Sequence, residues 1–307
     1  MTDNIVSSLL KKIAGMDEAF SAGAYNIREN GESVGRQSTE NIIITPKDGK
    51  PGIDIKVMPF TKGETAHIPV VITDTGRTDT VYNDFYIGEG ADVVIVAGCG
   101  IHNSGCETSE HDGVHKFFVG KNARLKYIEK HYGEGGGTGE RVLNPTTSVS
   151  LSEGASCEME MVQIGGVDSS VRETDASLDA DAKLIVTERL MTHGSQTVKS
   201  DMLINLNGSG SSAQVISRSV AKDESEQVFN PVAVGNCDCR AHIQCDSIIM
   251  DNAKVRSIPE ISANHSDAQI VHEAAIGRIN NDQILKLQTL GMTVDEAEKV
   301  IIDGFLK

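Results

Sequence analysis

The residues with the richest metal chemistry lie near the C-terminus. The segment from residue 237 to residue 273 contains the potential ligands Cys237, Cys239, Cys245, His265, His272 and Glu273. Thiolate, imidazole and carboxylate groups together can hold iron or an iron-sulfur cluster. We therefore expect the function of the chain to reside in this segment.

Each of these ligands also has an ordinary structural interpretation. Cys245 follows an apolar residue at strand spacing, where a single cysteine is often a small core residue. Cys237 and Cys239 would point to one face of an extended chain about 7 Å apart, so they could chelate a metal only if the backbone bends. His272 and Glu273 would point to opposite faces, so a shared metal requires a turn or a dimer seam. The ligands could therefore come from one chain or from two.

A second group of potential ligands consists of Cys99, His102, Cys106, His111 and His115. Their intervals of three, four, five and four residues fit no closed zinc-finger pattern, and the Gly and Ser residues among them favour a flexible loop. Residues 133–140 are rich in glycine but lack the Lys-Ser/Thr of a phosphate-binding loop. We expect a loose connection there, and ATP would have to bind a partner.

Composition limits the classes of function. The 307 residues carry 44 acidic and 28 basic side chains, a net charge of −16, which disfavours a nucleic-acid partner. No stretch approaches 18 apolar residues, and the N-terminus lacks an uninterrupted apolar segment, so we expect a soluble, cytoplasmic protein. Six cysteines are too few for a disulfide scaffold and are expected to be free thiols or ligands.

The elements that must position these residues are mostly strands. Asn4 to Phe20 is expected to be a helix, followed by a Gly- and Asn-rich link to about residue 40. Helical periodicity returns at Asp282 to Leu290, and Thr293 and Glu296 form a capping box that opens a last helix. Between the helices lie short β-branched runs bounded by turn residues, including Ile42 to Thr45, Ile68 to Thr73, Val93 to Ala97, Leu125 to Ile128 and Leu184 to Thr187.

A short motif recurs along the strand-rich region. A turn residue precedes an alanine, and an apolar residue follows two positions later; the alanines are Ala91, Ala123, Ala155, Ala182, Ala213, Ala241, Ala253 and Ala268. The steps are 32, 32, 27, 31 and 28 residues before they shorten to 12 and 15. A period near 30 residues indicates a stacked β-solenoid, whereas the alternative β-sandwich would show turns every 8 to 12 residues. The terminal helices are candidate caps for the solenoid ends.

The last predicted helix has one apolar face. It is formed by Val294, Ala297, Val300, Ile301 and Phe305. Such a face needs a surface to cover it. Packing on the solenoid is one interpretation, and docking of a partner is the other.

Two blocks of sequence resemble the core domain of the SufB/SufD iron-sulfur assembly proteins. One block contains Gln244-Cys245-Asp246-Ser247 with Ile248-Ile249-Met250, followed by His272-Glu273-Ala274 and the segment from Asp282 to Phe305. The other contains Gly98-Cys99, then His115 and Lys121 to Tyr127. Together they cover about residues 90 to 307, and the Gln-Cys-Asp-Ser feature favours a SufB-like over a SufD-like chain.

The resemblance implies a fold and a set of roles. The fold is an all-β core forming a right-handed parallel β-helix (41–280), with an N-terminal helical segment and link (1–40) and C-terminal helices (281–307). The implied protein is a non-catalytic scaffold that builds a transient 2Fe-2S or 4Fe-4S cluster, with a SufC-like ABC ATPase on its C-terminal helices and with a sulfur donor and recipient apoproteins as further partners. Cys245 matches the essential cluster or sulfur-accepting cysteine, His272 and Glu273 match proposed ligands, and Cys99 matches a proposed sulfur relay.

The chain also departs from the family pattern. Val271 stands where an acidic residue usually precedes the histidine, and Cys237 and Cys239 have no counterpart in the usual ligand set. Because the chain is short, we expect a minimal SufB-like protein that forms a homodimer within a two-plus-two complex. The alternatives are a SufD-like structural partner without its own cluster and a β-helix carbohydrate-active enzyme, whose polyanionic substrates this acidic chain would repel.

Overall fold

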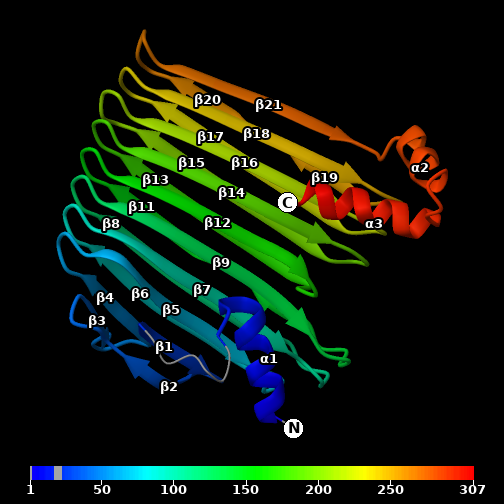
Figure 1. The fold of residues 1–307 in the computed structure, drawn as a ribbon, viewed down its shortest axis with the longest axis horizontal. Coiled ribbons are helices and arrows are strands. Elements are labelled where there is room, and N and C mark those ends of the chain that lie inside the picture. The colour runs from blue at the N-terminus through cyan, green and yellow to red at the C-terminus, as the bar shows by residue number, and fades with distance from the viewer. Residues whose placement is uncertain (1, 17–22) are drawn as a thin grey trace.

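Parallel strands stacked in two sheets make up most of the molecule in this computed structural model, which describes residues 2–16 and 23–307 (Figure 1). Successive strands alternate between the two sheets, and they stack as a solenoid of about eight turns. The prediction of an all-β core built as a β-helix with helices at both ends is therefore confirmed.

The strands are long and regular. Sheet A has ten strands in the order β2 (Glu32–Gln37), β1 (Ala24–Glu29), β5 (Lys62–Ile72), β7 (Asp92–His102), β9 (Arg124–Glu134), β12 (Ser156–Gly165), β14 (Lys183–Thr192), β16 (Ser212–Ala221), β18 (Arg240–Ile249) and β21 (Gln269–Gly277). Sheet B has eleven strands, which are β3 (Ile42–Pro46), β4 (Gly52–Val57), β6 (Thr78–Ile87), β8 (Ser109–Val119), β10 (Arg141–Leu143), β11 (Thr146–Leu151), β13 (Ser169–Leu178), β15 (Thr197–Leu206), β17 (Glu226–Gly235), β19 (Lys254–Ser257) and β20 (Glu260–Ala263). The pairs β1 with β2 and β3 with β4 are antiparallel.

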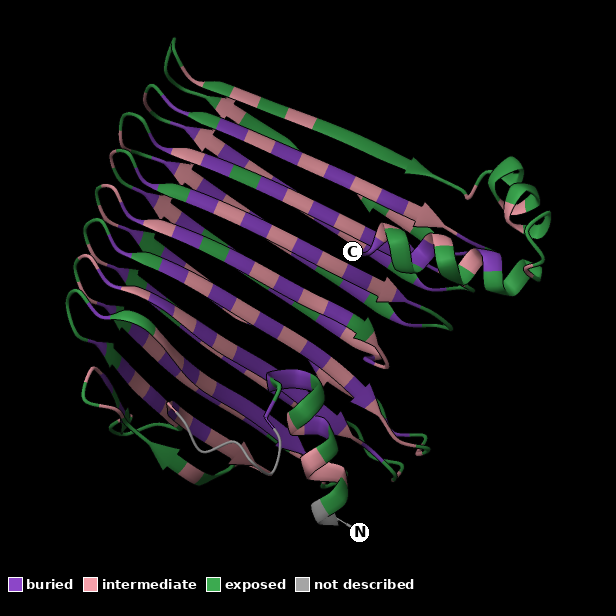
Figure 2. Ribbon diagram, viewed as in Figure 1, coloured by how far each residue is buried: buried purple, intermediate pink, exposed green. Residues whose placement is uncertain are grey.

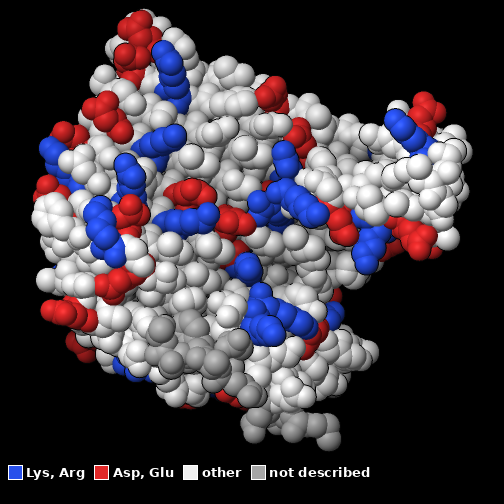
Figure 3. Space-filling model, in the orientation of Figure 1, with Lys and Arg blue, Asp and Glu red and all other residues white. Residues whose placement is uncertain are grey.

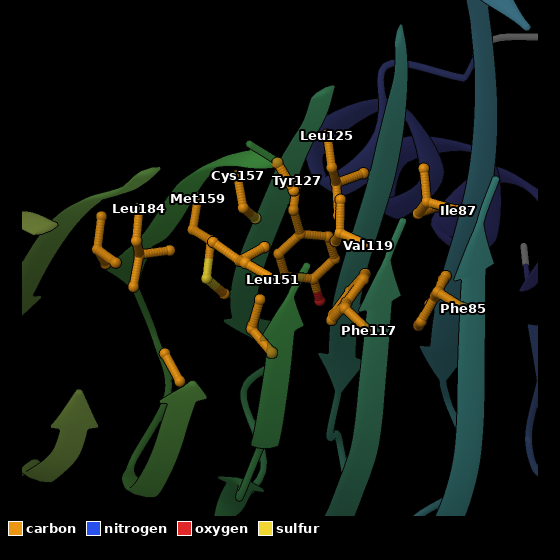
Figure 4. Packing of buried hydrophobic residues seen from close by; sticks show 14 of the residues in the cluster. Phe85, Ile87, Phe117, Val119, Leu125, Tyr127, Leu151, Cys157, Met159 and Leu184 are labelled. Carbon is orange, nitrogen blue, oxygen red and sulfur yellow. The ribbon is translucent and has the colours of Figure 1, made fainter. Parts of the chain in front are cut away.

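The core lies between the two sheets. Side chains alternate between the interior and the outer faces, as the banded strands in Figure 2 show. Near the middle of the solenoid, Phe85 stacks on Phe117 with ring centroids 4.2 Å apart, and Phe117 packs on Tyr127 at 4.7 Å, beside Leu151 and Met159 (Figure 4). The β-branched runs of the sequence are therefore strands because one side of each run is buried in this interior.

The repeat seen in the sequence corresponds to stacked turns, although its last alanines are offset. Ala91, Ala123, Ala155 and Ala182 each precede residues that pair directly across sheet A. In the following turn Lys183 pairs with Ser212, so the position of Ala182 is taken by Ser211 and then by Cys239. Ala213 and Ala241 lie two residues further along, which keeps them inside because strand side chains alternate with a period of two.

The N-terminal segment differs from the expectation. The first helix, α1, spans Thr2–Ala14, shorter than predicted, and Gly15 with a positive φ of 66° follows it. The predicted helix end at Phe20 lies outside the described residues. The expected link to residue 40 instead contains the hairpin of β1 and β2, which a Gly31 turn joins. The Asn-Gly pair there is a hairpin signal that the sequence analysis treated as loop composition.

The terminal helices do not cap the solenoid as expected. Helix α1 packs across the outer face of sheet A, where Gly98 and Gly100 leave room for its Leu9 and Ile13. Helices α2 (Asn281–Gln288) and α3 (Val294–Phe305) lie beside the ends of the later strands (Figure 1). Among the described residues, none covers the last turn, formed by β19, β20 and β21, which we call the open end. Its β21 is exposed along most of its length (Figure 2).

The glycine-rich segment is not loose. Gly135, Gly137 and Gly139 lie directly on the preceding loop, and the Gly137 and Gly139 amides donate hydrogen bonds to the Asn103 and Gly105 carbonyls. A Cβ atom at any of these three glycines would lie 2.1 to 2.2 Å from a backbone oxygen of that loop. Glycine is therefore required there by close backbone packing rather than by flexibility.

Candidate functional site

Cys245 lies in the middle of β18 and points into the solenoid near its open end. Its side chain is only 3% exposed. His272, on the neighbouring strand β21, places its Nε2 atom 3.3 Å from the Cys245 sulfur. These two predicted ligands are therefore brought together, one turn from the uncovered edge of sheet A.

The surroundings of Cys245 are polar, with serine hydroxyls and the Glu188 carboxylate near the thiol. A cavity of about 20 Å³, room for roughly one water molecule, lies beside it and is lined in part by Glu188 and by several serines. Burial raises the pKa of the Cys245 thiol to about 11, and the Glu188 charge adds to this although a hydrogen bond with Ser257 opposes it. Burial also lowers the pKa of His272. At neutral pH the pair is therefore a thiol beside a neutral imidazole. The serines are Ser200, Ser217, Ser219, Ser247 and Ser257.

Glu273 lies on the other side of the sheet. Its Oε1 atom is 2.7 Å from Nε2 of His242, and both side chains are exposed on the outer face of sheet A. This follows from strand alternation, which turns neighbouring residues to opposite faces. Glu273 therefore does not reach the metal-binding atoms of Cys245 and His272 within this chain.

Cys237 and Cys239 lie at the far end of the same strand. The Cys237 thiol donates a hydrogen bond of 2.9 Å to the Gly208 carbonyl, and Cys239 is packed in the hydrophobic core. Cys239 is six residues from Cys245 along extended chain, about 20 Å away. His265 is in the exposed turn before β21, 3.8 Å from Asp267. Within residues 2–16 and 23–307, no three His, Cys, Asp or Glu side chains converge on a metal position.

Cys99 is the centre of a second, quite different cluster. It points inward from β7 and pairs in register with His131 on β9, while His111 approaches from β8 in sheet B. Nδ1 of His111 is 3.3 Å from Asp79, and Nε2 of His131 is 3.6 Å from Glu129. All five of these side chains are at most 7% exposed.

The electrostatics at Cys99 favour ionisation of the thiol. Burial opposes the charged form, but the charges and hydrogen bonds of His111 and His131 outweigh it and lower the pKa of Cys99 to about 7. Burial likewise opposes the charged imidazoles, yet Cys99 and the carboxylates raise the pKa of His111 to about 10 and that of His131 to about 9. The pKa of the thiol is thus lowered at Cys99 and raised at Cys245.

The zinc-like group in the sequence is divided by the fold. Cys99, His111 and His115 are inside the solenoid, and His115 is held by the Tyr127 hydroxyl at 2.8 Å. His102 lies 3.5 Å from Glu134, and Cys106 is exposed in the loop after β7. These residues therefore do not form a shared metal site.

Buried polar side chains connect the two cysteine regions. Arg172 donates a hydrogen bond of 3.0 Å to Glu129, and its Nε is 3.6 Å from Glu188. Glu188 accepts hydrogen bonds from Ser200 at 3.1 Å and from Ser217 at 3.0 Å. Ser217 is the register partner of Cys245 in sheet A. We call Glu129, Arg172, Glu188 and Ser217 the polar row.

The polar row is not among the sites predicted from the sequence, although the sequence carries a signal for it. In β9, Leu125, Tyr127, Glu129 and His131 are the inward positions, while Lys126 and Lys130 point outward. Charged residues at alternating positions that continue an apolar face are unusual, because a buried charge needs a partner. Their partners lie on strands 40 or more residues away, which no local pattern reveals.

The C-terminal apolar stripe is split between two surroundings. Ala297 is buried, and α3 packs on the solenoid through Ile302 and Leu306, which contact Val220 and Met250. Val294 and Val300 are 44% and 48% exposed. Figure 3 shows an uncharged area in the region of α2, bordered by acidic and basic side chains that continue along α3. The exposed part of the stripe continues onto α2 through Leu285 and Leu290.

Comparison with known proteins identifies the family. The model of the SUF system FeS cluster assembly SufBD core domain matches residues 71–305. The chain belongs to the SufBD family. A SufBD family iron-sulfur cluster assembly protein of Methanocaldococcus jannaschii is 28% identical over 279 residues, which are 88% of this chain and 86% of that protein.

Further archaeal relatives agree with this assignment. A SufBD family protein of Archaeoglobus fulgidus is 26% identical over 83% of this chain and 68% of its own length, and one of Methanothermobacter thermautotrophicus is 25% identical over 76% and 57%. The expected role in iron-sulfur cluster assembly is thereby supported over the carbohydrate-active alternative. Among the described residues, no helix has the length and apolar character that crossing a membrane requires.

Proposed function

We propose that this SufBD family protein is a SufB-type scaffold that accepts sulfur at Cys99 and builds an iron-sulfur cluster on Cys245. The observation that carries the proposal is the 3.3 Å pair of Cys245 and His272 beside the open end. A buried thiol next to a neutral imidazole supplies two ligands of the kind that iron-sulfur clusters accept. A purely structural, SufD-like chain has no need of this pair.

The protonation states of the pair suit reversible binding. With a pKa of about 11, the Cys245 thiol holds its proton until a metal displaces it. Iron binding there therefore releases a proton. The buried thiolate is stable only while the metal is bound to it. An imidazole ligand in place of a further cysteine suits a scaffold that must give its product away.

A second copy of the chain would complete the ligand set. The open end exposes the edge of β21 together with Val271 and Ile276, which are 55% and 41% exposed. Pairing of two such ends as a homodimer would cover both edges and bring two Cys245 and His272 pairs toward one seam. Either a 2Fe-2S or a 4Fe-4S cluster is compatible with two ligands from each chain. Glu273 would join the set from the outer face only through rearrangement of β21.

Cys237 and Cys239 have a smaller place in this proposal. Both thiols are already engaged by the solenoid, through a carbonyl contact and through core packing. They would become ligands only after the turn before β18 opens. Their spacing along one face of the chain still allows chelation of one metal in that opened form.

Sulfur would move within the solenoid. Cys99 is the ionised thiol, Cys245 is the acceptor, and the polar row with the serine-lined cavity lies between them. The sulfane sulfur leaves Cys99 only when another thiolate attacks it, so its passage to Cys245 needs a small thiol carrier that leaves as the new persulfide and frees the Cys99 thiolate. The persulfide anion of that carrier would meet the Arg172 guanidinium and serine hydroxyls along this interior, which lowers its desolvation cost. The sulfur donor and the recipient apoproteins are proposed to act on this protein in the cytoplasm.

The C-terminal helices would bind the energy-supplying partner. Leu285, Leu290, Val294 and Val300 form an exposed apolar surface on α2 and α3, and the buried side of α3 is anchored next to β18, which carries Cys245. Docking of a SufC-like ABC ATPase there would link its movement to the cluster site. Hydrolysis of ATP occurs on that partner, so the scaffold itself is not an enzyme.

Anaerobic reconstitution with iron and sulfide tests the scaffold assignment. We expect wild-type protein to acquire cluster absorbance together with iron and acid-labile sulfide, and Cys245→Ala to lose them. Cys157→Ala is the matched control, because Cys157 is an equally buried strand cysteine in the hydrophobic core. Equal cluster yields in Cys245→Ala and in wild type, or no cluster in either, would contradict the scaffold assignment and favour the structural, SufD-like alternative.

A further inference from the structure

We propose that His111 and His131 are positioning residues that hold Cys99 as a buried thiolate, each through an arginine-carboxylate-imidazole chain that ends at the sulfur. This inference deepens the proposed function and rests on Cys99 being the sulfur acceptor. Neither histidine was assigned to it from the sequence, where His111 belonged to a rejected zinc pattern.

The first chain of contacts has its carboxylate and imidazole on β6 and β8 of sheet B and its arginine on β1 of sheet A. Arg28 donates two hydrogen bonds to Asp79, of 2.6 and 2.8 Å, and Asp79 lies 3.3 Å from Nδ1 of His111. Asp79 and His111 are register partners on β6 and β8. The imidazole is thus held by a carboxylate on one side, and the charge of Cys99 contributes to its raised pKa.

The second chain has its carboxylate and imidazole on β9 of sheet A and its arginine on β13 of sheet B. Arg172 donates a hydrogen bond of 3.0 Å to Glu129, and Glu129 lies 3.6 Å from Nε2 of His131. Cys99 and His131 are register partners on β7 and β9, so the imidazole stacks directly beside the thiol. Arg172 also contacts the His131 ring directly, with its Nη2 atom 3.4 Å from Nδ1. Two chains of contacts, with their imidazoles on opposite sheets, therefore lie next to one thiol.

The buried charges balance around an ionised Cys99. The cations Arg28, Arg172, His111 and His131 face the carboxylates of Asp79, Glu129 and Glu188, which leaves one positive charge for a thiolate. The other titratable groups facing this cluster are neutral, since burial lowers the pKa of His115 to about 4 and raises that of Tyr127. The remaining wall is apolar and consists of Val70, Ile72, Ile101, Leu143 and Val167.

The arrangement suits attack on a persulfide. The Cys99 thiolate attacks the outer sulfur of R–S–SH, a bond forms between the two sulfurs, and the bond to R–S breaks. The leaving thiolate takes the proton of one imidazolium, and the persulfide now on Cys99 keeps the transferred sulfane sulfur. No outside oxidant or reductant is needed, because the donor persulfide already carries the sulfur in the required state.

Ultraviolet absorbance of the thiolate measures the ionisation of Cys99 directly. The difference between wild type and Cys99→Ala across a pH titration isolates this one thiol among six. We expect a midpoint near pH 7 in wild type and above 9 in His111→Gln and in His131→Gln. With a glutathione persulfide donor at pH 7, sulfur uptake at Cys99 should fall roughly fiftyfold in either variant and recover as the pH is raised. The matched control is His115→Gln, which removes a buried neutral imidazole and should leave the midpoint unchanged.

The outcomes separate the two claims. A wild-type midpoint near 9, or uptake at pH 7 that is unaffected by either histidine substitution, would overturn the positioning role. A midpoint near 7 with no sulfur uptake would leave the thiolate in place and overturn Cys99 as the acceptor. The wild-type midpoint needs only Cys99→Ala for comparison, so the test survives misfolding of a histidine variant.

Discussion

Cys99 and Cys245 both point inward from sheet A, two residues out of register with each other, yet their surroundings set them up for different chemistry. Cys99 is enclosed by imidazoles and carboxylates and has a pKa of about 7, whereas Cys245 is surrounded by serines and has a pKa of about 11. Burial opposes ionisation at both sites. The difference therefore comes from the neighbouring charges and not from depth, which the fold makes similar.

The two regions also differ in what supports them from outside. Helix α1 covers the strand that carries Cys99, while the strand that carries Cys245 is anchored to α3 and lies next to the open end. The first region is therefore a closed, charge-dense interior, and the second lies next to surfaces that partners can reach. This division matches a sulfur-accepting site and an assembly site within one solenoid.

The largest expected effect is at the residue that joins the two regions. Arg172→Met leaves Glu129 and Glu188 buried without their shared cation, so we expect a loss of about 3–5 kcal/mol in the free energy of unfolding. Urea denaturation measures it. The control Arg189→Met removes a partly exposed ion pair with Glu160 and should cost less than about 1 kcal/mol. Equal losses in the two variants would show that the polar row is not structurally coupled.

A smaller effect is expected where α3 meets the Cys245 half. Ile302→Ala removes a buried side chain that contacts Val220 and Met250, which should weaken the docking of α3 by about 2–3 kcal/mol. Hydrogen exchange of the α3 amides reports this local loss. Val300→Ala, on the exposed side, should leave exchange unchanged and weaken binding of the ATPase partner instead. Reversed behaviour of the two variants would contradict the assignment of the faces of α3.

Sequence reasoning could predict the solenoid because its cause is local and periodic. Alternating apolar positions and a step near 30 residues follow directly from strands that each bury one face, and Thr293 with Glu296 forms the predicted capping box. The placement of Cys245 and His272 on neighbouring strands follows from their separation of about one turn, but the register pairs Cys245 with Ala274, so the contact with His272 is a diagonal one. The opposite directions of His272 and Glu273 follow from strand alternation alone.

What could not be predicted depends on contacts between distant strands. Arg172 meets Glu129 across 43 residues, and whether a histidine such as His111 binds zinc or a carboxylate depends on the loop that places it. The position of α1 on the outer face of sheet A could not be predicted either, because Gly98 and Gly100, far along the chain, create the space for it. Periodicity gives the direction of a side chain but not the identity of its partner.

The pH dependence of stability gives a third, still smaller effect, and it separates the two cysteine regions. The raised pKa values of His111 and His131 stabilise the fold below an unfolded value of about 6.5, and that contribution is lost as the pH rises through about 9 and about 10. The lowered pKa of Cys99 has the opposite effect on proton binding, because the folded thiol loses its proton at a lower pH than the unfolded thiol does. Between about pH 7 and 8.5 the folded state therefore binds about one more proton than the unfolded state.

This excess proton has a measurable slope. The free energy of unfolding should fall by about 1.4 kcal/mol per pH unit over that range. Cys245 stays protonated in the folded state, and its unfolded thiol ionises only as the pH approaches about 8.5, so below about pH 8 the slope reports the Cys99 region. Urea denaturation at several pH values gives the slope, and the double variant His111→Gln/His131→Gln should flatten it. A wild-type stability that is constant or rises over this range would contradict the assigned ionisation of the cluster.

The central claim is that sulfur enters at Cys99 and reaches Cys245 inside one solenoid. Peptide mass mapping after brief anaerobic exposure to a persulfide donor tests this claim directly. We predict that the mass of one added sulfur atom is found first on the Cys99 peptide and later on the Cys245 peptide, and that Cys99→Ala prevents labelling of Cys245. Labelling of Cys245 at an undiminished rate in Cys99→Ala would contradict the account, because the two cysteines would then receive sulfur independently.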